Sequence, residues 1–320
     1  MWPADTHSPV VVVVGPTAVG KTRFSIKLAG LLGGEIISAD SRYFYRGMNI
    51  GTAKPTPDEM LDVKHHLINV ANPDQTWNLA LFQNEATKAI NAIHDRSKLP
   101  VLVGGTGQYI QAVLENWDIP EQIPDQLLRA AIEKWADQIG AKSLHQKLAI
   151  IDPIAADQIE YQNQRRTIRA LEVIFGTGRR FSDQRRKRIS PYDLKIIGLI
   201  RPRMELYQRI DERIDWMMEN GLIAEVQGLL AAGYAKDLPA FSAIGYREVI
   251  GYLEGKISLE EAIILMKRKT REFVRRQANW FKSDNPNIYW VKADEIDFEE
   301  IINFVYSNSG WVNSIEPKIK

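Results

Sequence analysis

Apolar runs alternate with amphipathic stretches along the first hundred residues of the chain. Val10–Val14 is a run of five valines, and Glu35–Ala39 and Leu99–Val103 are further apolar runs of strand length. Between them, Lys21–Leu32 and Trp77–Ile93 carry apolar residues at helical spacing. A β-α-β-α-β order of this kind predicts a parallel sheet with crossover helices. Ligands are then expected at the carboxyl ends of the strands.

Charged helical patterns replace the strand signals in the middle of the chain. Strand and helix signals return further on, at Leu194–Ile200, residues 203–283, Ile288–Val291 and Phe298–Tyr306. The simplest interpretation is one α/β core that is interrupted by a helical insertion. We therefore predict a catalytic core formed by residues 1–112 and 192–320, which includes C-terminal helices, and an inserted helical domain at residues 113–191.

The sequence after the valine run matches the phosphate-binding pattern G-x-x-x-x-G-K-[ST] at each fixed position. Its flanks, a buried strand and an amphipathic helix, are the context that this motif requires, so we predict a P-loop NTPase-like core. The loop amides, the helix N-terminus and the lysine suit a polyphosphate, and the threonine hydroxyl suits Mg²⁺. The predicted phosphate ligands are Gly15, Pro16, Thr17, Ala18, Val19, Gly20, Lys21 and Thr22.

Two polar residues are expected at the same edge of the sheet. Asp40 follows the second strand, where it could act as a general base, hold Mg²⁺ through water, or serve only as a turn or helix cap. Thr106 lies in a glycine turn after the third strand and is either a site hydroxyl or a turn residue. That strand ends without the acid that holds the metal in many P-loop NTPases. The absence favours a transferase that binds a polyphosphate group over a hydrolysing motor.

The composition is that of an ordinary globular protein, with 45% hydrophobic and 25% charged residues among 320. The chain has no cysteine, which excludes disulfides, thiolate metal sites and thiol catalysis and fits a reducing compartment. We see no apolar signal core in the first nine residues, and the valine run is too short to span a bilayer. We therefore expect a cytoplasmic protein without a membrane segment.

Basic residues are clustered although the net charge is only +1. Six of the ten residues at 179–188 are basic, and Lys267, Arg271 and Arg275 recur at helical spacing with aromatic residues nearby. Such surfaces suit a nucleic acid, although a solvated helix face is the alternative for each. Four arginines after the returning strand either clamp a phosphate or pair with acids on their own helix: Arg201, Arg203, Arg209 and Arg213.

Several motifs in collinear order resemble those of the tRNA dimethylallyltransferases. They are Gly-Pro-Thr-Ala-Val-Gly-Lys-Thr, Ile-Ile-Ser-Ala-Asp-Ser-Arg, Tyr-Arg-Gly-Met-Asn-Ile-Gly-Thr-Ala-Lys-Pro, His-His-Leu-Ile, Gly-Gly-Thr-Gly-Gln-Tyr-Ile, Ala-Ile-Gly-Tyr-Arg-Glu and Thr-Arg-Glu-Phe-Val-Arg-Arg-Gln. The likeness extends from about residue 10 to residue 292, and the set is specific although each piece is weak.

The resemblance implies transfer of a dimethylallyl group from dimethylallyl diphosphate to N6 of the adenine 3′ of the anticodon, in tRNAs that read codons beginning with U. Asp40 would be the general base, and Thr106 would bond in the reaction centre. Arg213 would join the loop in binding diphosphate, with Mg²⁺ at Thr22. Contacts to tRNA would come from Asp40, Ser41, Arg42, Tyr43, Thr106, Arg129, Gln164, Arg165, Arg166, Thr167 and Ile168. We expect a monomer.

The sequence departs from the family pattern at Tyr43-Phe44, where Gln-Val is common, and at Gln108, where Leu is common. Either aromatic ring could stack on the flipped adenine or its neighbours. Three other functions are weighed against the tRNA prenyltransferase: a small-molecule P-loop kinase, a nucleic-acid-binding ATPase module and a prenyltransferase of free adenylate. The lack of an acid at the end of the strand Leu99–Val103 argues against the kinase and the ATPase module. The two basic clusters and the long helical insertion argue against the prenyltransferase of free adenylate.

Overall fold

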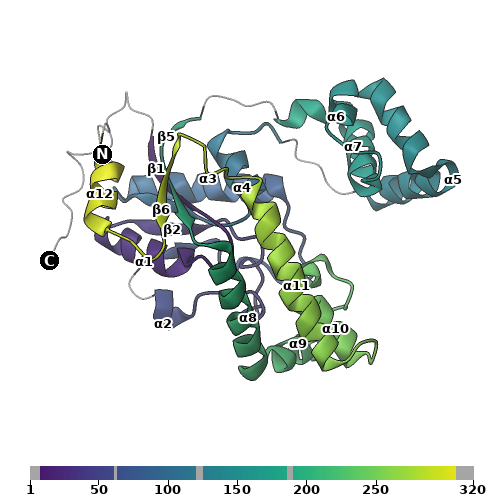
Figure 1. Ribbon diagram of the computed structural model, residues 1–320. Helices are drawn as coiled ribbons and strands as arrows, with labels where there is room; N and C mark the ends of the chain where they lie inside the picture. The colour runs from purple at the N-terminus through teal and green to yellow at the C-terminus, as the bar shows by residue number, and fades with distance from the viewer. Residues whose placement is uncertain (1–7, 61–62, 120–124, 186–189, 308–320) are drawn as a thin grey trace. The chain divides into compact units, whose positions relative to one another are not determined.

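The computed structural model describes residues 8–60, 63–119, 125–185 and 190–307 (Figure 1). The chain divides into two compact units. The first contains the described residues up to Asn78, Phe82–Leu114 and those from Pro191 onward, and the second contains Leu79–Leu81 and Glu115–Ser190. Among the described residues, no helix is both long and apolar enough to cross a membrane.

The first unit is built on a parallel sheet of six strands, so the predicted α/β class is confirmed. The strand order is β3-β2-β4-β1-β5-β6, and every neighbouring pair is parallel. The strands are β1 (Ser8–Val14), β2 (Glu35–Ser38), β3 (His65–His66), β4 (Pro100–Val103), β5 (Tyr192–Ile200) and β6 (Ile288–Lys292).

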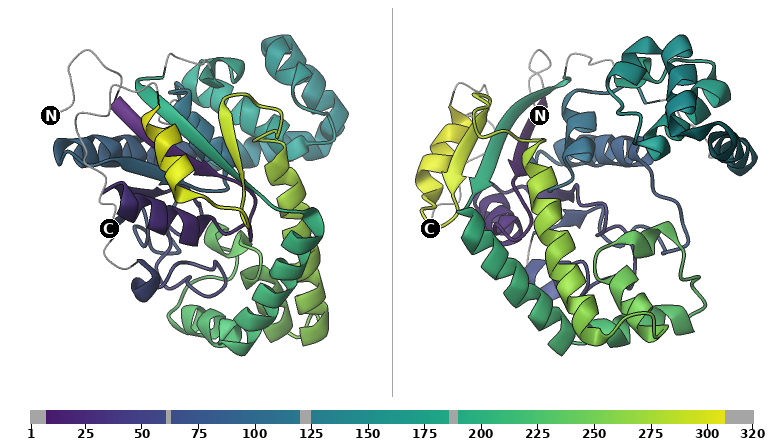
Figure 2. Two further views of the ribbon diagram at one scale, coloured as in Figure 1. Left: turned by 60° about the vertical axis from the view of Figure 1, so that its left-hand side comes forward. Right: turned by 45° about the vertical axis from the view of Figure 1, so that its right-hand side comes forward.

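α1 (Lys21–Leu31) and α3 (Leu79–Asp95) pack on opposite faces of this sheet, through Phe24 and Phe82 respectively. The other helices that accompany the sheet along the chain are α2 (Pro57–Met60), α4 (Gly107–Leu114), α8 (Arg203–Glu219), α9 (Leu222–Ala231), α10 (Tyr246–Leu253), α11 (Leu259–Ala278) and α12 (Phe298–Tyr306). Single turns of 3₁₀ helix lie at Ser182–Arg185 and Pro239–Ser242. Figure 2 shows α8 and α11 running side by side.

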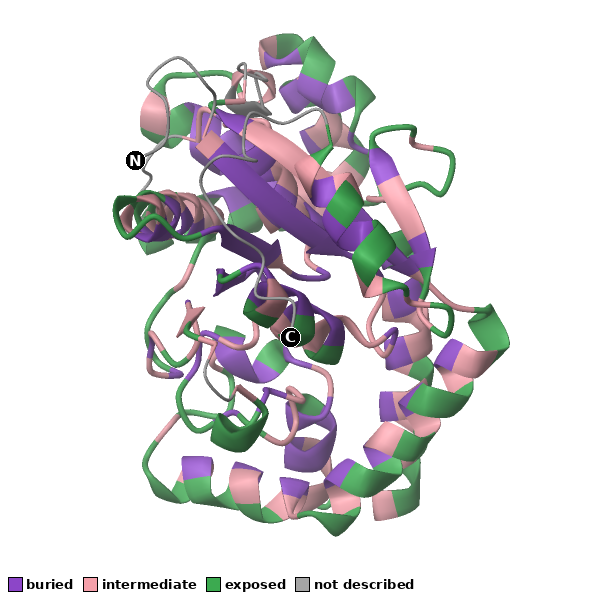
Figure 3. Ribbon diagram, turned by 90° about the vertical axis from the view of Figure 1, so that its left-hand side faces the viewer, coloured by how far each residue is buried: buried purple, intermediate pink, exposed green. Residues whose placement is uncertain are grey.

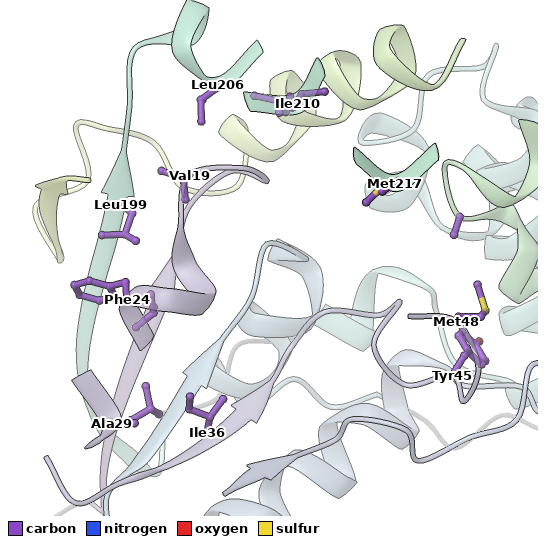
Figure 4. Packing of buried hydrophobic residues seen from close by; sticks show 14 of the residues in the cluster. Val19, Phe24, Ala29, Ile36, Tyr45, Met48, Leu199, Leu206, Ile210 and Met217 are labelled. Carbon is purple, nitrogen blue, oxygen red and sulfur yellow. The ribbon is translucent and has the colours of Figure 1, made fainter. Parts of the chain in front are cut away.

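The valine run supplies the core of both faces. Val11 and Val13 belong to the cluster that includes Phe24 of α1, whereas the alternate valines belong to the cluster that includes Phe82 of α3. All five valines are fully buried, and each side chain contributes about 2 kcal/mol by leaving water. Figure 3 shows the buried central strands, and Figure 4 shows part of the first cluster, where Leu206 and Ile210 of α8 approach Val19.

The short edge strand β3 was not predicted, because two residues carry no periodicity. His66 Nε2 lies 2.7 Å from Glu35 on the neighbouring strand. Glu35, whose side chain is buried, also binds Arg96 at 2.6 Å and Lys98 at 3.1 Å. An ionic cluster therefore lies at the amino end of β2, opposite to the end that carries Asp40.

The second unit is helical and has its own apolar core. Its helices are α5 (Gln126–Ile151), α6 (Pro153–Asp157) and α7 (Gln164–Thr177). Gly140 interrupts α5 with non-helical angles, φ 81° and ψ 157°. The side chains of Asp125, Asp152 and Asn163 cap the three helix N-termini, and such caps typically contribute about 1 kcal/mol each.

Candidate functional site

The phosphate loop joins β1 to α1 and leaves the start of this helix open. Gly20 has φ 110°, a left-handed conformation that residues with a β-carbon rarely adopt, directly before α1 begins at Lys21. No acidic residue lies in the first turn, and no side chain among the described residues caps the helix. The first N–H groups of α1 are therefore available to an anion, which the helix dipole also favours.

Lys21 turns its ammonium group back onto the loop. Nζ donates hydrogen bonds to the carbonyl oxygens of Gly15 at 3.0 Å and Pro16 at 2.8 Å. Burial lowers the pKa of Lys21 to about 8; the Asp40 carboxylate partly opposes this shift, and Arg213 adds to it. The side chain is thus mostly protonated at pH 7 but holds its proton less firmly than a solvated lysine does.

Three arginines that follow β5 contact the phosphate loop. Each guanidinium donates one hydrogen bond to a loop residue: Arg201 Nε to Val19 O at 3.1 Å, Arg209 Nε to Ala18 O at 2.8 Å, and Arg213 Nη2 to Thr17 Oγ1 at 3.1 Å. The loop is therefore braced from a segment about two hundred residues away in the sequence.

The two roles that the sequence left open for these arginines are now separated. Arg201 pairs with Glu205 four residues on and also donates to Ala293 O, so its donors are largely used. Arg213 Nε, in contrast, is buried without a hydrogen-bond partner among the described residues, and burial lowers the pKa of its guanidinium. A buried donor left unpaired is costly, so an anion at this place would stabilise Arg213.

Two cavities meet at the carboxyl edge of the sheet. The larger cavity has a volume of about 590 Å³. Its lining includes most of the phosphate loop, namely Thr17, Ala18, Gly20, Lys21 and Thr22, together with Asp40, Tyr43, Thr52 and Arg213. The other, of about 270 Å³, is lined by Asp40, Ser41, Arg42, Thr106 and Arg213, and it has an apolar wall that includes Met217, Met266 and Phe273. Four residues line both cavities: Thr17, Asp40, Thr52 and Arg213. The first cavity suits a diphosphate, and the second has room for an apolar group.

Asp40 lies where the two cavities share a wall. Its Oδ1 accepts a hydrogen bond from the Arg42 amide at 2.9 Å, which fixes the carboxylate in a turn. Its Oδ2 has no hydrogen-bond partner in the described part of the chain. The turn role and the site role are thus compatible, because one oxygen holds the turn and the other is left for a proton or a substrate.

Thr106 lines the second cavity and is the residue directly before α4. It is half-buried, and its carbonyl accepts the amides of Tyr109 and Ile110. The hydroxyl has no hydrogen-bond partner among the described residues, although a threonine here is well placed to cap the helix. The Thr106 hydroxyl is therefore free to bond a ligand in this cavity.

The two aromatic residues after Arg42 differ in accessibility. The Tyr43 hydroxyl donates to Ala53 O at 2.8 Å, and burial together with the nearby Asp40 raises its pKa. Tyr43 lines the larger cavity. Phe44 is fully buried and stacks on Phe82 with ring centroids 5.8 Å apart. The idea that Phe44 stacks on a nucleotide base is therefore wrong.

The helical unit presents only some of the residues assigned to tRNA by resemblance. Arg165 is exposed and Arg166 half-buried in the first turn of α7, beside the half-buried Gln164. The side chains of Thr167 and Ile168 are buried, at 0% and 5% exposure, so they support this turn from within rather than offering contacts themselves. Arg129 Nε binds Glu133 at 3.0 Å and is therefore partly neutralised.

Two of the three basic residues that recur at helical spacing on α11, Lys267 and Arg271, form ion pairs within the protein. Lys267 pairs with Asp215 at 2.7 Å, and Arg271 pairs with Asp211, both on α8. These two cations therefore join helices, and Arg275 alone of the three is exposed without an ion pair among the described residues. Of the other basic segment, residues 186–188 lie outside the described residues.

Glu225 of α9 shapes the cavity wall and was not anticipated. Its Oε2 accepts the amides of Asn49 at 2.9 Å and Ile50 at 2.8 Å, and its Oε1 accepts that of Gly51 at 3.2 Å. The Tyr246 hydroxyl donates to the same carboxylate. Thr52, which lines both cavities, directly follows this loop. A lone glutamate on an amphipathic helix gives no sequence signal for such a role.

Comparisons with known proteins show the family to which the chain belongs. The family model of IPP transferase matches residues 43–284, and that of isopentenyl transferase matches residues 8–74. A tRNA dimethylallyltransferase of Roseiflexus sp. (strain RS-1) is 50% identical over 292 residues, which are 91% of this chain and 95% of the relative. Another, from Roseiflexus castenholzii, is 49% identical over 305 residues, or 94% of this chain and 99% of that protein.

Solved structures are similar as well. The tRNA isopentenylpyrophosphate transferase of Bacillus halodurans is 44% identical, with a TM-score of 0.69 over 93% of this chain and 95% of its own. A eukaryotic dimethylallyltransferase acting on tRNA is 26% identical, with a TM-score of 0.73 over 96% of this chain and 76% of its own. The fold that carries the phosphate loop is therefore the one these enzymes share.

Proposed function

Because the chain belongs to the IPP transferase family, together with the tRNA dimethylallyltransferases, we propose that it prenylates tRNA. The reaction is transfer of a dimethylallyl group from dimethylallyl diphosphate to N6 of the adenine 3′ of the anticodon, in tRNAs that read codons beginning with U. N6 forms a bond to C1 of the dimethylallyl group, the C1–O bond breaks, and diphosphate leaves with the electron pair. One N6 proton is lost.

The observation that carries the proposal is the position of Asp40 in both cavities. Its Oδ2, which has no hydrogen-bond partner among the described residues, would accept the N6 proton, and the Thr106 hydroxyl, which also lines the second cavity, would orient the amine. The leaving diphosphate would lie in the larger cavity. Asp40 would thus take the proton from the amine next to the site from which diphosphate departs.

The phosphate loop would stabilise the charge that develops on the leaving group. The free N–H groups at the start of α1, the Lys21 ammonium and the Arg213 guanidinium all border the larger cavity. These donors are held in place by the loop's own contacts, so little reorganisation is needed as the C1–O bond breaks. The buried and unpaired Nε of Arg213 supports its assignment as a diphosphate ligand.

Mg²⁺ fits this donor set. Among the described residues no group of three or more His, Asp or Glu side chains could hold a metal ion by itself. Mg²⁺, however, commonly binds through one or two protein oxygens and substrate phosphates, and the larger cavity offers the Thr22 hydroxyl. When bound, the ion would neutralise charge on the diphosphate oxygens.

Recognition of tRNA would use groups on both units. Ser41 and Arg42 line the second cavity, and Tyr43 lines the first, close to the expected position of the target nucleotide. Gln164, Arg165 and Arg166 would contact the anticodon loop from the helical unit. The target adenine must leave its stack to reach Asp40, which costs a few kcal/mol.

The test of the reaction is transfer of labelled dimethylallyl from its diphosphate to unmodified tRNA, with ATP turnover measured in parallel. We expect label on tRNA and no ATP turnover. Consumption of ATP without labelled tRNA would instead identify a kinase or an ATPase, and label on free adenylate but not on tRNA would identify an adenylate prenyltransferase.

The test of the site compares Asp40→Asn with Asp74→Asn, an exposed acid outside both cavities. We expect Asp40→Asn to lower the transfer rate by about 10²-fold to 10⁴-fold, the usual contribution of a general base, with tRNA affinity nearly unchanged. Asp74→Asn should transfer at the normal rate. Equal losses of rate and of tRNA affinity in Asp40→Asn would show that Asp40 is structural.

We also propose a cytoplasmic monomer. The absence of cysteine fits a reducing compartment. Sedimentation equilibrium across the concentration range used for activity would test the monomer directly, and a dimer mass would refute it.

A further inference from the structure

The last turn of α11 reaches the two loops that form the catalytic edge of the sheet. Gln277 is 7% exposed there. Its Oε1 accepts a hydrogen bond from the Thr17 amide at 2.8 Å, and its Nε2 donates one to Gly105 O at 2.9 Å. One side chain thus connects the phosphate loop after β1 to the glycine turn after β4.

The space around this carboxamide is closely filled. A β-carbon on Gly105 would lie 2.3 Å from Gln277 Nε2, well inside contact distance. Gly105 does not have a positive φ, so it is required for space and not for its backbone conformation. The glycine turn is therefore shaped around the glutamine side chain.

Only a carboxamide meets both demands at position 277. The Thr17 amide needs an acceptor and the Gly105 carbonyl needs a donor, which also fixes the orientation of the Gln277 amide. A glutamate would accept from Thr17 but would set a negative oxygen against the Gly105 carbonyl. An apolar side chain would leave the buried Gly105 carbonyl and the half-buried Thr17 amide without these partners.

The two connected segments carry groups from opposite sides of the reaction centre. Thr17 Oγ1 accepts a hydrogen bond from Arg213 Nη2 at 3.1 Å, and Gly105 directly precedes Thr106. Gln277 itself lines neither cavity that contains Asp40; it lines a separate cavity behind the phosphate loop, beside Gly15 and Pro16. It therefore acts from behind the site.

We propose that Gln277 is a positioning residue that sets the distance between the diphosphate site and the Thr106 hydroxyl. This inference rests on the proposed function, because it assigns those two groups to one reaction. The carboxamide holds both loops in register, so that the leaving group and the attacking amine are aligned. A misplacement of about 1 Å in such an arrangement costs about a hundredfold in rate.

The role can be separated from simple anchoring of α11. This helix is also joined to α8 through Lys267 and Arg271, and to α10 through the contact of Lys269 Nζ with Glu248 at 2.6 Å. Loss of Gln277 should therefore leave α11 in place. Lys269→Met is a matched control, because it removes a polar anchor from the same helix away from both loops.

The experiment measures single-turnover transfer, dimethylallyl diphosphate affinity, tRNA affinity and Tm for Gln277→Glu, Gln277→Met and Lys269→Met. We expect both Gln277 variants to transfer about tenfold to a hundredfold more slowly at saturating substrates, with tRNA affinity within about twofold of the original. Lys269→Met should lose Tm and retain its rate. Normal rates in both Gln277 variants, or losses that follow Tm as in Lys269→Met, would overturn the proposal.

A double variant tests the contact itself. Gly105→Ala forces its new methyl group against Gln277 Nε2, whereas Gly105→Ala with Gln277→Ala removes that overlap. We expect the double variant to transfer no more slowly than Gln277→Ala alone, so that the two losses do not multiply. Multiplied losses would show that the two residues act independently. Absence of tRNA transfer by the unaltered protein would instead refute the proposed function, and would be seen before any variant is compared.

Discussion

The low pKa of Lys21 predicts an alkaline limit on substrate binding. Among the described residues, Lys21 is the only lysine that lines the larger cavity. Burial lowers its pKa to about 8, more than two pH units below that of a solvated lysine. A dimethylallyl diphosphate ion should bind the protonated side chain and lose this contact as Lys21 is deprotonated.

The size of the effect follows from the titration of one group. With a pKa of about 8, Lys21 is protonated in about nine-tenths of the molecules at pH 7 and in about one-tenth at pH 9. The affinity of the free enzyme for dimethylallyl diphosphate should therefore fall about tenfold between these values, which is about 1.4 kcal/mol. The terminal phosphate of the ester loses its last proton at about pH 6 and gains negative charge as the pH rises, so the loss of affinity on the alkaline side reports on the protein.

The assay is calorimetric titration with dimethylallyl diphosphate at half-unit steps from pH 6.5 to pH 9.5, in the absence of tRNA. Lys21→Arg is the matched variant, because a guanidinium keeps its charge throughout this range. We expect Lys21→Arg to bind more weakly at pH 7 but with little pH dependence. The alkaline loss in kcat/KM should follow the same curve, since this ratio reports groups of the free enzyme.

Two results would refute the reasoning. Constant affinity up to pH 9.5 in the unaltered protein would mean that Lys21 keeps its proton or does not touch the diphosphate. The same alkaline loss in Lys21→Arg would assign it to another group, and burial also lowers the pKa of Lys54 to about 8. Lys54 is unchanged in Lys21→Arg, so this single variant separates the two lysines.

Three further predictions concern stability and tRNA affinity. Glu225→Gln should lower the free energy of unfolding by about 2 kcal/mol in urea, because the carboxylate holds the amides of residues 49–51. Burial raises the pKa of Glu35, but its hydrogen bonds to cationic partners outweigh burial and lower it to about 2. The Glu35 carboxylate should therefore contribute about 3 kcal/mol to the free energy of unfolding above pH 4.5, and this contribution should vanish towards pH 2. It is measured as the difference in unfolding free energy between the original protein and Glu35→Gln. Arg165→Ala should weaken tRNA binding and reduce its salt dependence by about one charge.

Each of the three has an outcome that contradicts it. Unchanged urea midpoints in Glu225→Gln would show that water replaces the carboxylate. A constant difference between the original and Glu35→Gln from pH 7 to pH 2 would mean that Glu35 does not titrate in this range. An unaltered salt slope in Arg165→Ala, with Lys142→Ala as an exposed control in the same unit, would remove Arg165 from the tRNA surface.

The elements built from contiguous signals were predictable from the sequence. The valine strand, the glycine loop and the following helix lie within twenty-five residues, and their chemistry is local. The last helix, Phe298–Tyr306, has the bounds that its apolar spacing indicates. Short β3 was missed because a strand of two residues is defined by its neighbour β2 and not by its own pattern.

The contacts that complete the site could not be predicted in this way. Gln277 meets the phosphate loop, and Glu225 meets residues 49–51, only because distant helices pack beside the sheet. The spacing of Lys267 and Arg271 predicted a charged face but not the acids of α8 that neutralise it. The backbone turn after Asp40, likewise, decides that Tyr43 borders a cavity while Phe44 enters the core.

The contact between Thr17 and Gln277 spans 260 positions of the chain. The ribosome completes the phosphate loop early and must then add about as many residues as this separation before its partner is synthesised. At about 5 to 20 residues per second, this interval lasts roughly 13 to 50 s. Nascent chains that end before Gln277 therefore lack the contact between the phosphate loop and α11.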